Sequence, residues 1–389
     1  MRVETSAGAL MDSYRRWPVT FVEGRGARLT DAQGKTYIDL LAGIAVASVG
    51  HCHPKVTAAI AQQASRLVHV SNLYENPSSL AVAERLAELT GGMKAFFANS
   101  GAEAIECALK LARKHAGGER VRIVAAEGGF HGRTFGALSA TGQPSKQAPF
   151  QPLVPGFVHV GFGDPGAIER ELLAGDVAAV LLEPVQGEAG VVVPAPGYLA
   201  AVRDLCDRHG ALLILDEVQT GLGRTGAWFG FEHAGVTPDI LCLAKALAGG
   251  LPMGACLAQP EIAAAFVPGD HATTFGGGPV QSAAALAVLQ VIEEEGLVER
   301  ARAIGDRLRS GLSAAFGGSN VRGLGALLAI QLDAPVAREL AAAALERGVL
   351  VNDIGDSVIR LSPPLVITDP DIDRAVELLG EAWHEVSAS

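Results

Sequence analysis

A single lysine lies in a long apolar stretch near the middle of the chain, where it could act as a nucleophile. Lys245 is the one charged residue from Ile240 to Ala258 in DILCLAKALAGGLPMGACLA. Burial disfavours the charged form of an amine, lowers its pKa and frees it to form a Schiff base. Two other interpretations are open from these residues alone. The lysine could lie at the surface with its stem on an apolar edge, or the run could span a membrane, which its lysine, glycines and proline disfavour.

An aspartate at the end of the apolar run ALLILDE lies 29 residues before this lysine. A carboxylate at a buried strand end, here Asp216, needs a cationic or hydrogen-bonding partner. The ring nitrogen of pyridoxal phosphate (PLP) would be such a partner, and a Schiff-base lysine with an aspartate facing that nitrogen is how proteins bind PLP. Gln219 follows in the turn. A structural salt bridge between Asp216 and Lys245 is the alternative.

Two more strand–turn–helix junctions have residues suited to binding such a cofactor. FFANSGAEAIECALKLAR places Ser100, Gly101 and Ala102 at a helix start, where free N–H groups favour a phosphate. In GGFHGRTFG, the ring of Phe130 could stack on a flat cofactor, and Arg133 could bind a carboxylate through two hydrogen bonds. Taken singly, the helix start is equally explained by an ordinary N-cap. Phe130 and Arg133, taken singly, are better explained as an exposed aromatic and a surface arginine.

Two other motifs suggest different ligands but have simpler explanations. GFGDPG (161–166) fits the dinucleotide pattern G-x-G-x-x-G, yet Asp164 and Pro165 also form an N-cap followed by a first-turn proline. A nucleotide-binding protein is therefore kept as an alternative of another class. His51 and His53 flank Cys52, but no third cluster of metal ligands accompanies them, so we expect no metal site.

The surrounding elements predict an α/β fold. From about residue 93 to 260, runs rich in Val, Leu and Ile alternate with helical patterns, which indicates a doubly wound domain with a mainly parallel sheet. The last hundred residues predict a smaller α+β domain that starts inside a helical segment, so a long connecting helix is expected. In the N-terminal segment, GARLTDAQGKTYIDL predicts a hairpin. The expected division is 1–45, packing with the small domain, 46–289 and 290–389.

Composition excludes several classes of protein. Of 389 residues, 49% are hydrophobic and 19% charged, which allows a large core and argues against disorder. The net charge of -11 disfavours nucleic acid as a partner. The five cysteines include no C-x-x-C pair, and the first residues have no apolar run, so we expect a cytoplasmic protein without disulfides or membrane contact.

With these motifs in place, nearly the whole chain resembles the class III aminotransferases, PLP enzymes of fold type I. The resemblance rests on GKTYIDLLAGIAVASVGHCHP, FFANSGAEA, FHGRT, EPVQGEAGV, LDEVQTGLGRTG, LAKALAGGLPMGA and VIRLSPPL. It implies that Lys245 holds PLP and moves a proton, that Asp216 keeps the ring nitrogen protonated, and that Gln219 bonds the phenolic oxygen. The other residues implied to surround PLP are Ser100, Gly101 and Ala102 at the phosphate, Phe130 on the ring, and Glu217, Val218 and Thr274.

The resemblance also implies substrate contacts and a homodimer. Arg133 would bind the α-carboxylate of the amino donor, and Arg360 that of glutamate or 2-oxoglutarate, with Glu183 pairing with Arg360 while the other substrate is bound. Glu188 would line the pocket. Thr273 and Thr274 match a pair whose second threonine reaches the neighbouring subunit's cofactor, so the active sites would be shared across the interface.

Within the class, GHCHP, FHGRT and the short length resemble the branch that acts on N2-acetyl-L-ornithine and 2-oxoglutarate in arginine biosynthesis. The products would be N-acetyl-L-glutamate 5-semialdehyde and L-glutamate. The alternatives within the class are ornithine, succinylornithine, succinyl-diaminopimelate, 4-aminobutyrate or a lysine-pathway donor.

Overall fold

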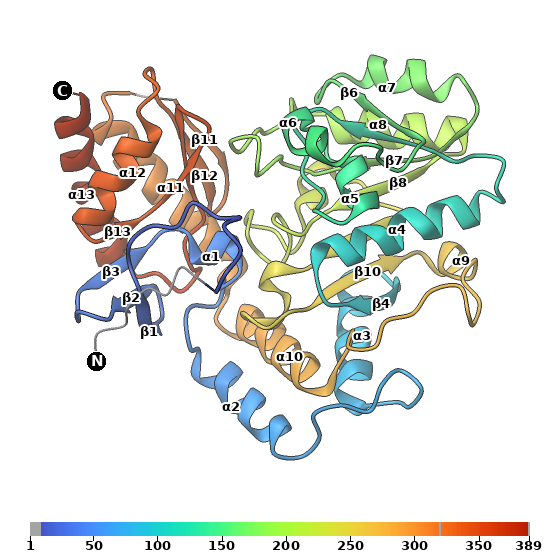
Figure 1. Ribbon diagram of the computed structural model, residues 1–389, viewed down its shortest axis with the longest axis horizontal. Coiled ribbons are helices and arrows are strands. Elements are labelled where there is room, and N and C mark those ends of the chain that lie inside the picture. Colours follow the sequence, from blue (N-terminus) through green and yellow to red (C-terminus); the bar gives the residue numbers. More distant parts are fainter. Residues whose placement is uncertain (1–8, 319, 388–389) are drawn as a thin grey trace.

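Seven strands form the central sheet of the larger part of the molecule (Figure 1). The computed structural model describes residues 9–318 and 320–387. The strand order is β4-β10-β9-β8-β7-β5-β6; neighbours from β9 to β6 are parallel, whereas β10 is antiparallel to β4 and β9. The strands are β4 (Lys94–Ala98), β5 (Arg122–Ala126), β6 (Phe157–Val160), β7 (Val177–Leu182), β8 (Leu212–Asp216), β9 (Ile240–Leu243) and β10 (Gly254–Ala258).

Both faces of this sheet are covered by helices. In β8, Leu213 and Leu215 pack in the same apolar cluster as residues of α8 (Tyr198–His209), whereas Leu212 and Ile214 pack with α4 (Gly101–His115). Successive side chains of a strand point to opposite faces, so α4 and α8 lie on opposite sides of the sheet. All residues of β7, β8 and β9 are buried, and the predicted α/β class with a mainly parallel sheet is confirmed.

The remaining helices of this part are mostly short or lie at its edges. Helix α10 packs against α2 and α3 and against the turn that begins at Lys245. These elements are α1 (Ala42–Ala45), α2 (Pro54–Ala64), α3 (Pro77–Leu89), α5 (Phe135–Ala140), α6 (Pro144–Gln147), α7 (Pro165–Leu172), α9 (Pro260–Ala263) and α10 (Pro279–Glu294), with single turns η1 (Ala148–Phe150), η2 (Gly230–Ala234) and η3 (Lys245–Ala248).

The C-terminal part combines two four-stranded sheets with three helices and lies beside the larger part (Figure 1). One sheet has the order β11-β12-β15-β14, and the other has the order β1-β2-β3-β13. The strands are β1 (Phe21–Arg25), β2 (Arg28–Asp31), β3 (Thr36–Asp39), β11 (Asn320–Leu324), β12 (Leu327–Gln331), β13 (Val349–Leu350), β14 (Asn352–Ile354) and β15 (Val358–Leu361), and the helices are α11 (Leu297–Ala315), α12 (Ala337–Glu346) and α13 (Asp369–Ser387).

The N-terminal hairpin and the C-terminal part of the chain meet in the second of these sheets. Strand β3 pairs in parallel with β13, so that the N-terminal hairpin extends a sheet completed by the C-terminal part. The proposed division at residues 45 and 289 stays a prediction, and residues 1–8 of its first segment lie outside the described residues. The expected long connecting helix is wrong, because Gly296 has φ +60 and separates α10 from α11.

Within the described residues, no helix is long and apolar enough to cross a bilayer. The interpretation of the stretch around Lys245 as a membrane span is wrong. That stretch instead forms β9, a turn and β10, two buried antiparallel strands of the central sheet.

Candidate active site

A cavity of about 480 Å³ lies where β8 and β9 end, at the edge where open α/β sheets bind ligands. Its walls come from segments far apart in the chain: the start of α4, the loop after β5, the loop after β7, and the residues that follow β8 and β9. Of the predicted site residues it is lined by Ser100, Gly101, Ala102, Phe130, Arg133, Glu183, Glu188, Asp216, Val218, Gln219 and Lys245.

Lys245 begins η3, two residues after the end of β9, and lines this cavity. Its backbone has φ +38, in a region that non-glycine residues rarely adopt and that recurs at functional sites. Burial lowers the pKa of the amine to about 8, against the opposing charge of Glu188. About a tenth of this amine is therefore neutral at pH 7, against less than a thousandth of an ordinary lysine, and this neutral fraction can act as a nucleophile or base.

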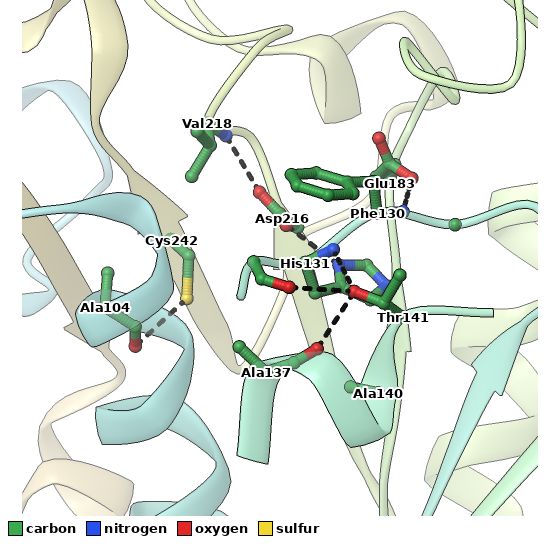
Figure 2. Close-up of polar contacts among 12 residues, drawn as sticks. Ala104, Phe130, His131, Ala137, Ala140, Thr141, Glu183, Asp216, Val218 and Cys242 are labelled. Carbon is green, nitrogen blue, oxygen red and sulfur yellow. Dashed lines mark hydrogen bonds and ion pairs between the residues drawn. The ribbon is translucent and has the colours of Figure 1, made fainter. Parts of the chain in front are cut away.

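Asp216 is the last residue of β8, and its carboxylate is held in place by two donors. One oxygen accepts the N–H of Val218 at 3.0 Å, and the other lies 2.8 Å from Nδ1 of His131 (Figure 2). Burial disfavours the charged imidazole, but the hydrogen bond and the charge of Asp216 outweigh it and raise the pKa of His131. The alternative interpretation, a structural salt bridge between Asp216 and Lys245, is not supported, because no such ion pair occurs among the described residues.

The sequence-based prediction missed His131. Its backbone N–H donates to Thr141 Oγ1 at 2.9 Å, which anchors the backbone at this residue. Its Nε2 is buried without a partner among the described residues. Its place in FHGRT, between two predicted site residues, was the signal that could have identified it. A histidine that orients a carboxylate beside a cofactor tunes that carboxylate's charge.

The start of α4 has the geometry expected of a phosphate cradle. Ser100 is the N-cap, and its hydroxyl accepts the N–H of Glu103 at 3.2 Å. A Cβ on Gly101 would lie 3.0 Å from both methyl carbons of Val218, so only glycine leaves this approach open. The backbone N–H groups of the first turn have no partner within the helix and favour an anion.

The side-chain amide of Gln219 has its oxygen paired and its nitrogen unpaired. Its Oε1 accepts from Arg360 at 3.3 Å, whereas its Nε2 is buried without a hydrogen-bond partner within the described part of the chain. An unpaired buried donor that lines a cavity indicates a ligand with an acceptor atom. This donor, the carboxylate of Asp216, the cradle at Gly101 and the amine of Lys245 together fit the oxygen, ring nitrogen, phosphate and aldehyde of PLP.

The partner of Arg360 differs from the expectation. Arg360 lies in β15 and pairs with Glu188 at 2.6 Å. Glu183, which was expected there, follows β7 directly and accepts the backbone N–H groups of Phe130 at 3.0 Å and Gly187 at 3.4 Å. Burial raises the pKa of Glu183 to about 7. These amides hold Glu183 in place, and the loop after it carries Glu188 to the arginine.

Arg360 and three other predicted residues do not line the cavity. Glu217 is buried and accepts from the N–H groups of Gly230 at 2.6 Å and Phe231 at 2.8 Å, so it anchors a loop. Thr273 accepts the N–H of Gly276 at 3.2 Å. Thr274 lines a separate small surface pocket with Asn72.

The two alternative motifs have structural roles. Asp164 caps α7 by accepting the N–H of Ala167 at 2.9 Å, as the N-cap interpretation of GFGDPG predicts. His51 lies 2.7 Å from Asp39, and His53 lies 3.0 Å from Glu295. No group of three or more metal-ligating side chains occurs among residues 9–318 and 320–387.

Comparison with known proteins agrees with this geometry. The sequence model of the class III aminotransferase family matches residues 10–383. An acetylornithine aminotransferase of Mycobacterium tuberculosis is 51% identical over 375 residues, which cover 95% of this chain and 93% of that protein. A crystal structure of acetylornithine aminotransferase from Elizabethkingia anophelis has a TM-score of 0.88 at 36% identity and covers 98% and 97% of the two chains. The ornithine aminotransferase of Toxoplasma gondii, solved with partial occupancy of PLP at its active site, has a TM-score of 0.95 at 36% identity and covers 98% and 94%.

Proposed function

This chain belongs to the class III aminotransferases, which are PLP-dependent, and we propose that it transfers the terminal amine of N2-acetyl-L-ornithine to 2-oxoglutarate. The products are N-acetyl-L-glutamate 5-semialdehyde and L-glutamate, in a step of arginine biosynthesis. The observation that supports this best is one cavity lined by the low-pKa amine of Lys245, by Asp216, by Arg133 and by Glu188, whose carboxylate pairs with the buried Arg360. Curated relatives named acetylornithine aminotransferase, 46% and 51% identical over nearly the full chain, support the choice of donor.

Each residue around the cavity binds a different part of PLP. Lys245 holds the cofactor through Nζ, Asp216 pairs with the ring nitrogen, and Gln219 donates Nε2 to the ring oxygen. The N–H groups after Ser100 bind the phosphate, and Phe130 packs on the ring. When bound, PLP supplies a ring that withdraws electrons from the carbon bearing the amine.

The amine of Lys245 also acts as the base. A neutral Nζ accepts a proton from the carbon next to the donor nitrogen and later returns a proton, because its pKa near 8 allows both states. Asp216 keeps a negative charge close to the ring nitrogen, and His131 holds that carboxylate in place.

Each of the two substrates has its own arginine for its α-carboxylate. Arg133 at the exposed side of the cavity binds the α-carboxylate of the amino donor. Arg360 binds the α-carboxylate of 2-oxoglutarate, and Glu188 neutralises Arg360 while the donor occupies the site. This assignment replaces the earlier expectation for Glu183.

The active sites are shared in a cytoplasmic homodimer. Thr274 lies outside the cavity of its own chain, and Leu73, Tyr74 and Phe275 close to it are 87%, 73% and 61% exposed. Large apolar side chains that gather in neighbouring loops mark an interface. A second copy that covers these loops would bring Thr274 to the phosphate of its partner.

The visible absorption spectrum tests the function. The purified protein with PLP should show a visible band that disappears when N2-acetylornithine is added without an oxo acid, and 2-oxoglutarate should restore it. A band that persists with N2-acetylornithine but bleaches with ornithine or 4-aminobutyrate would replace the donor. A protein that binds no PLP would reject the function altogether.

A further inference from the structure

Two cations lie beside one aromatic ring at the mouth of the cavity. Lys146 in α6 has its Nζ 4.7 Å from the ring centroid of Phe130, and Arg133 has its guanidinium carbon 5.7 Å from the same centroid. Arg133 lines the cavity and is exposed, and the half-buried Lys146 lies against the ring of Phe130, which also lines the cavity. Neither side chain makes a hydrogen bond or an ion pair within residues 9–318 and 320–387.

The carboxylates in this region are bound elsewhere. Glu188 is paired with Arg360 at 2.6 Å, and Glu183 accepts backbone N–H groups. Burial lowers the pKa of Lys146; Glu188 opposes this shift, and Arg133 adds to it. Two like charges held close together without a counter-ion, and partly shielded from water, favour an anion from outside the protein.

The geometry points to a two-cation carboxylate site formed by Arg133 and Lys146, in which Lys146 selects donors whose α-nitrogen is acylated. The inference rests on the proposed function and concerns the same cavity. The terminal amine reacts at Lys245 on the cavity floor, so the α-carbon of the donor extends toward the mouth. An α-carboxylate there is attracted by both cations.

The α-nitrogen decides how much of this attraction remains. In free ornithine the same carbon carries an ammonium, which Arg133 and Lys146 repel, so the attraction for the carboxylate is largely offset. Acylation makes that nitrogen neutral and leaves the attraction intact. The second cation therefore favours an N-acylated amino acid over its free form, because it adds attraction for one and little net interaction for the other.

Substitution of Lys146 tests the site in two ways. Lys146→Met removes the charge and keeps the length, Lys146→Arg keeps the charge, and Lys55→Met, in an exposed ion pair of α2, is the matched control. The first measurement is the affinity of the PLP-loaded enzyme for glutarate, a dicarboxylate without an amine. The second is the ratio of kcat/KM for N2-acetylornithine to kcat/KM for ornithine.

We expect Lys146→Met to weaken glutarate binding and to lower the selectivity ratio, each about tenfold, as for loss of one charge-assisted contact. The fall in the ratio should come from KM for N2-acetylornithine, with kcat retained, and Lys146→Arg should restore both values. Unchanged glutarate affinity in Lys146→Met, or an equal fall in kcat/KM for both amines, would overturn the inference. A wild-type enzyme that prefers another donor would instead reject the proposed function, and the glutarate measurement would still decide the anion site.

Discussion

At the scale of single residues, His131 is the side chain whose contribution the sequence left unassigned. We expect His131→Leu to retain PLP but to lower kcat about tenfold, because Asp216 loses one of the two donors that hold its carboxylate. Steady-state kinetics and the visible spectrum of the loaded enzyme measure the two properties. Asp216→Asn is the reference, with an expected loss of kcat of about a hundredfold or more, since it removes the charge itself.

His131→Asn tests whether the hydrogen bond to Asp216 is what matters, because the asparagine amide can still donate to that carboxylate but carries no charge. Partial recovery of kcat relative to His131→Leu would support a positioning role. A His131→Leu enzyme with the parental kcat and pH profile would show that the hydrogen bond from Val218 is enough to hold the carboxylate.

The pKa of Lys245 leads to a pH dependence with a definite sign. A pKa lowered to about 8 means that the amine loses its proton at lower pH than an ordinary lysine, near 10.4. The rate at which PLP reloads the apoprotein should therefore rise with pH and level off above about 8. Stopped-flow absorbance gives this rate, with the reaction of PLP and free N-acetyl-lysine as the reference. A rate that still rises steeply between pH 9 and 10 would show an unperturbed amine.

At the scale of elements, the start of α4 determines how closely a phosphate can approach. Gly101→Ala should weaken PLP binding about tenfold, because the new methyl group would lie 3.0 Å from Val218 and displace it or the first turn. Fluorescence titration of the apoprotein with PLP measures the affinity. Gly161→Ala in GFGDPG is the matched control, since the nearest atom to its added Cβ is 4.0 Å away. Equal affinities for the two variants would place the phosphate elsewhere.

Much of the fold could be predicted from local patterns. The runs that became β5, β7, β8 and β9 have Val, Leu and Ile on both faces, and Ser100 and Asp164 were recognisable as helix caps. Strand β10 and the break at Gly296 were missed, because short apolar runs and single glycines do not by themselves distinguish a strand, a turn and a helix.

Which residues line the site could be predicted from the sequence more easily than which of their side chains pair with one another. Motifs identified Lys245, Asp216 and Gln219 as cavity residues, but no pattern in EPVQGEAGV indicates which glutamate meets Arg360. That choice depends on how the sheet containing β15 packs against the loop after β7, which is a contact between distant parts of the chain. Glu183 accepts hydrogen bonds from backbone N–H groups, and Glu188 forms the ion pair with Arg360.

At the scale of the whole molecule, the proposed sharing of the active site between two copies predicts complementation between two defective chains. Lys245→Ala removes the amine that holds PLP, and Thr274→Ala should weaken PLP binding about tenfold through loss of one hydrogen bond to the phosphate. In a mixed dimer, the chain with Thr274→Ala still carries Lys245 and receives an intact Thr274 from its partner. One site of the two then has all of its native groups, whereas the other lacks both. Differently tagged chains, refolded together and purified through both tags, should therefore bind PLP with parental affinity at one site per dimer. If Thr274 acted within its own chain, the only site with Lys245 would keep the weak affinity of the Thr274→Ala homodimer, and a monomer by light scattering would exclude the shared site directly.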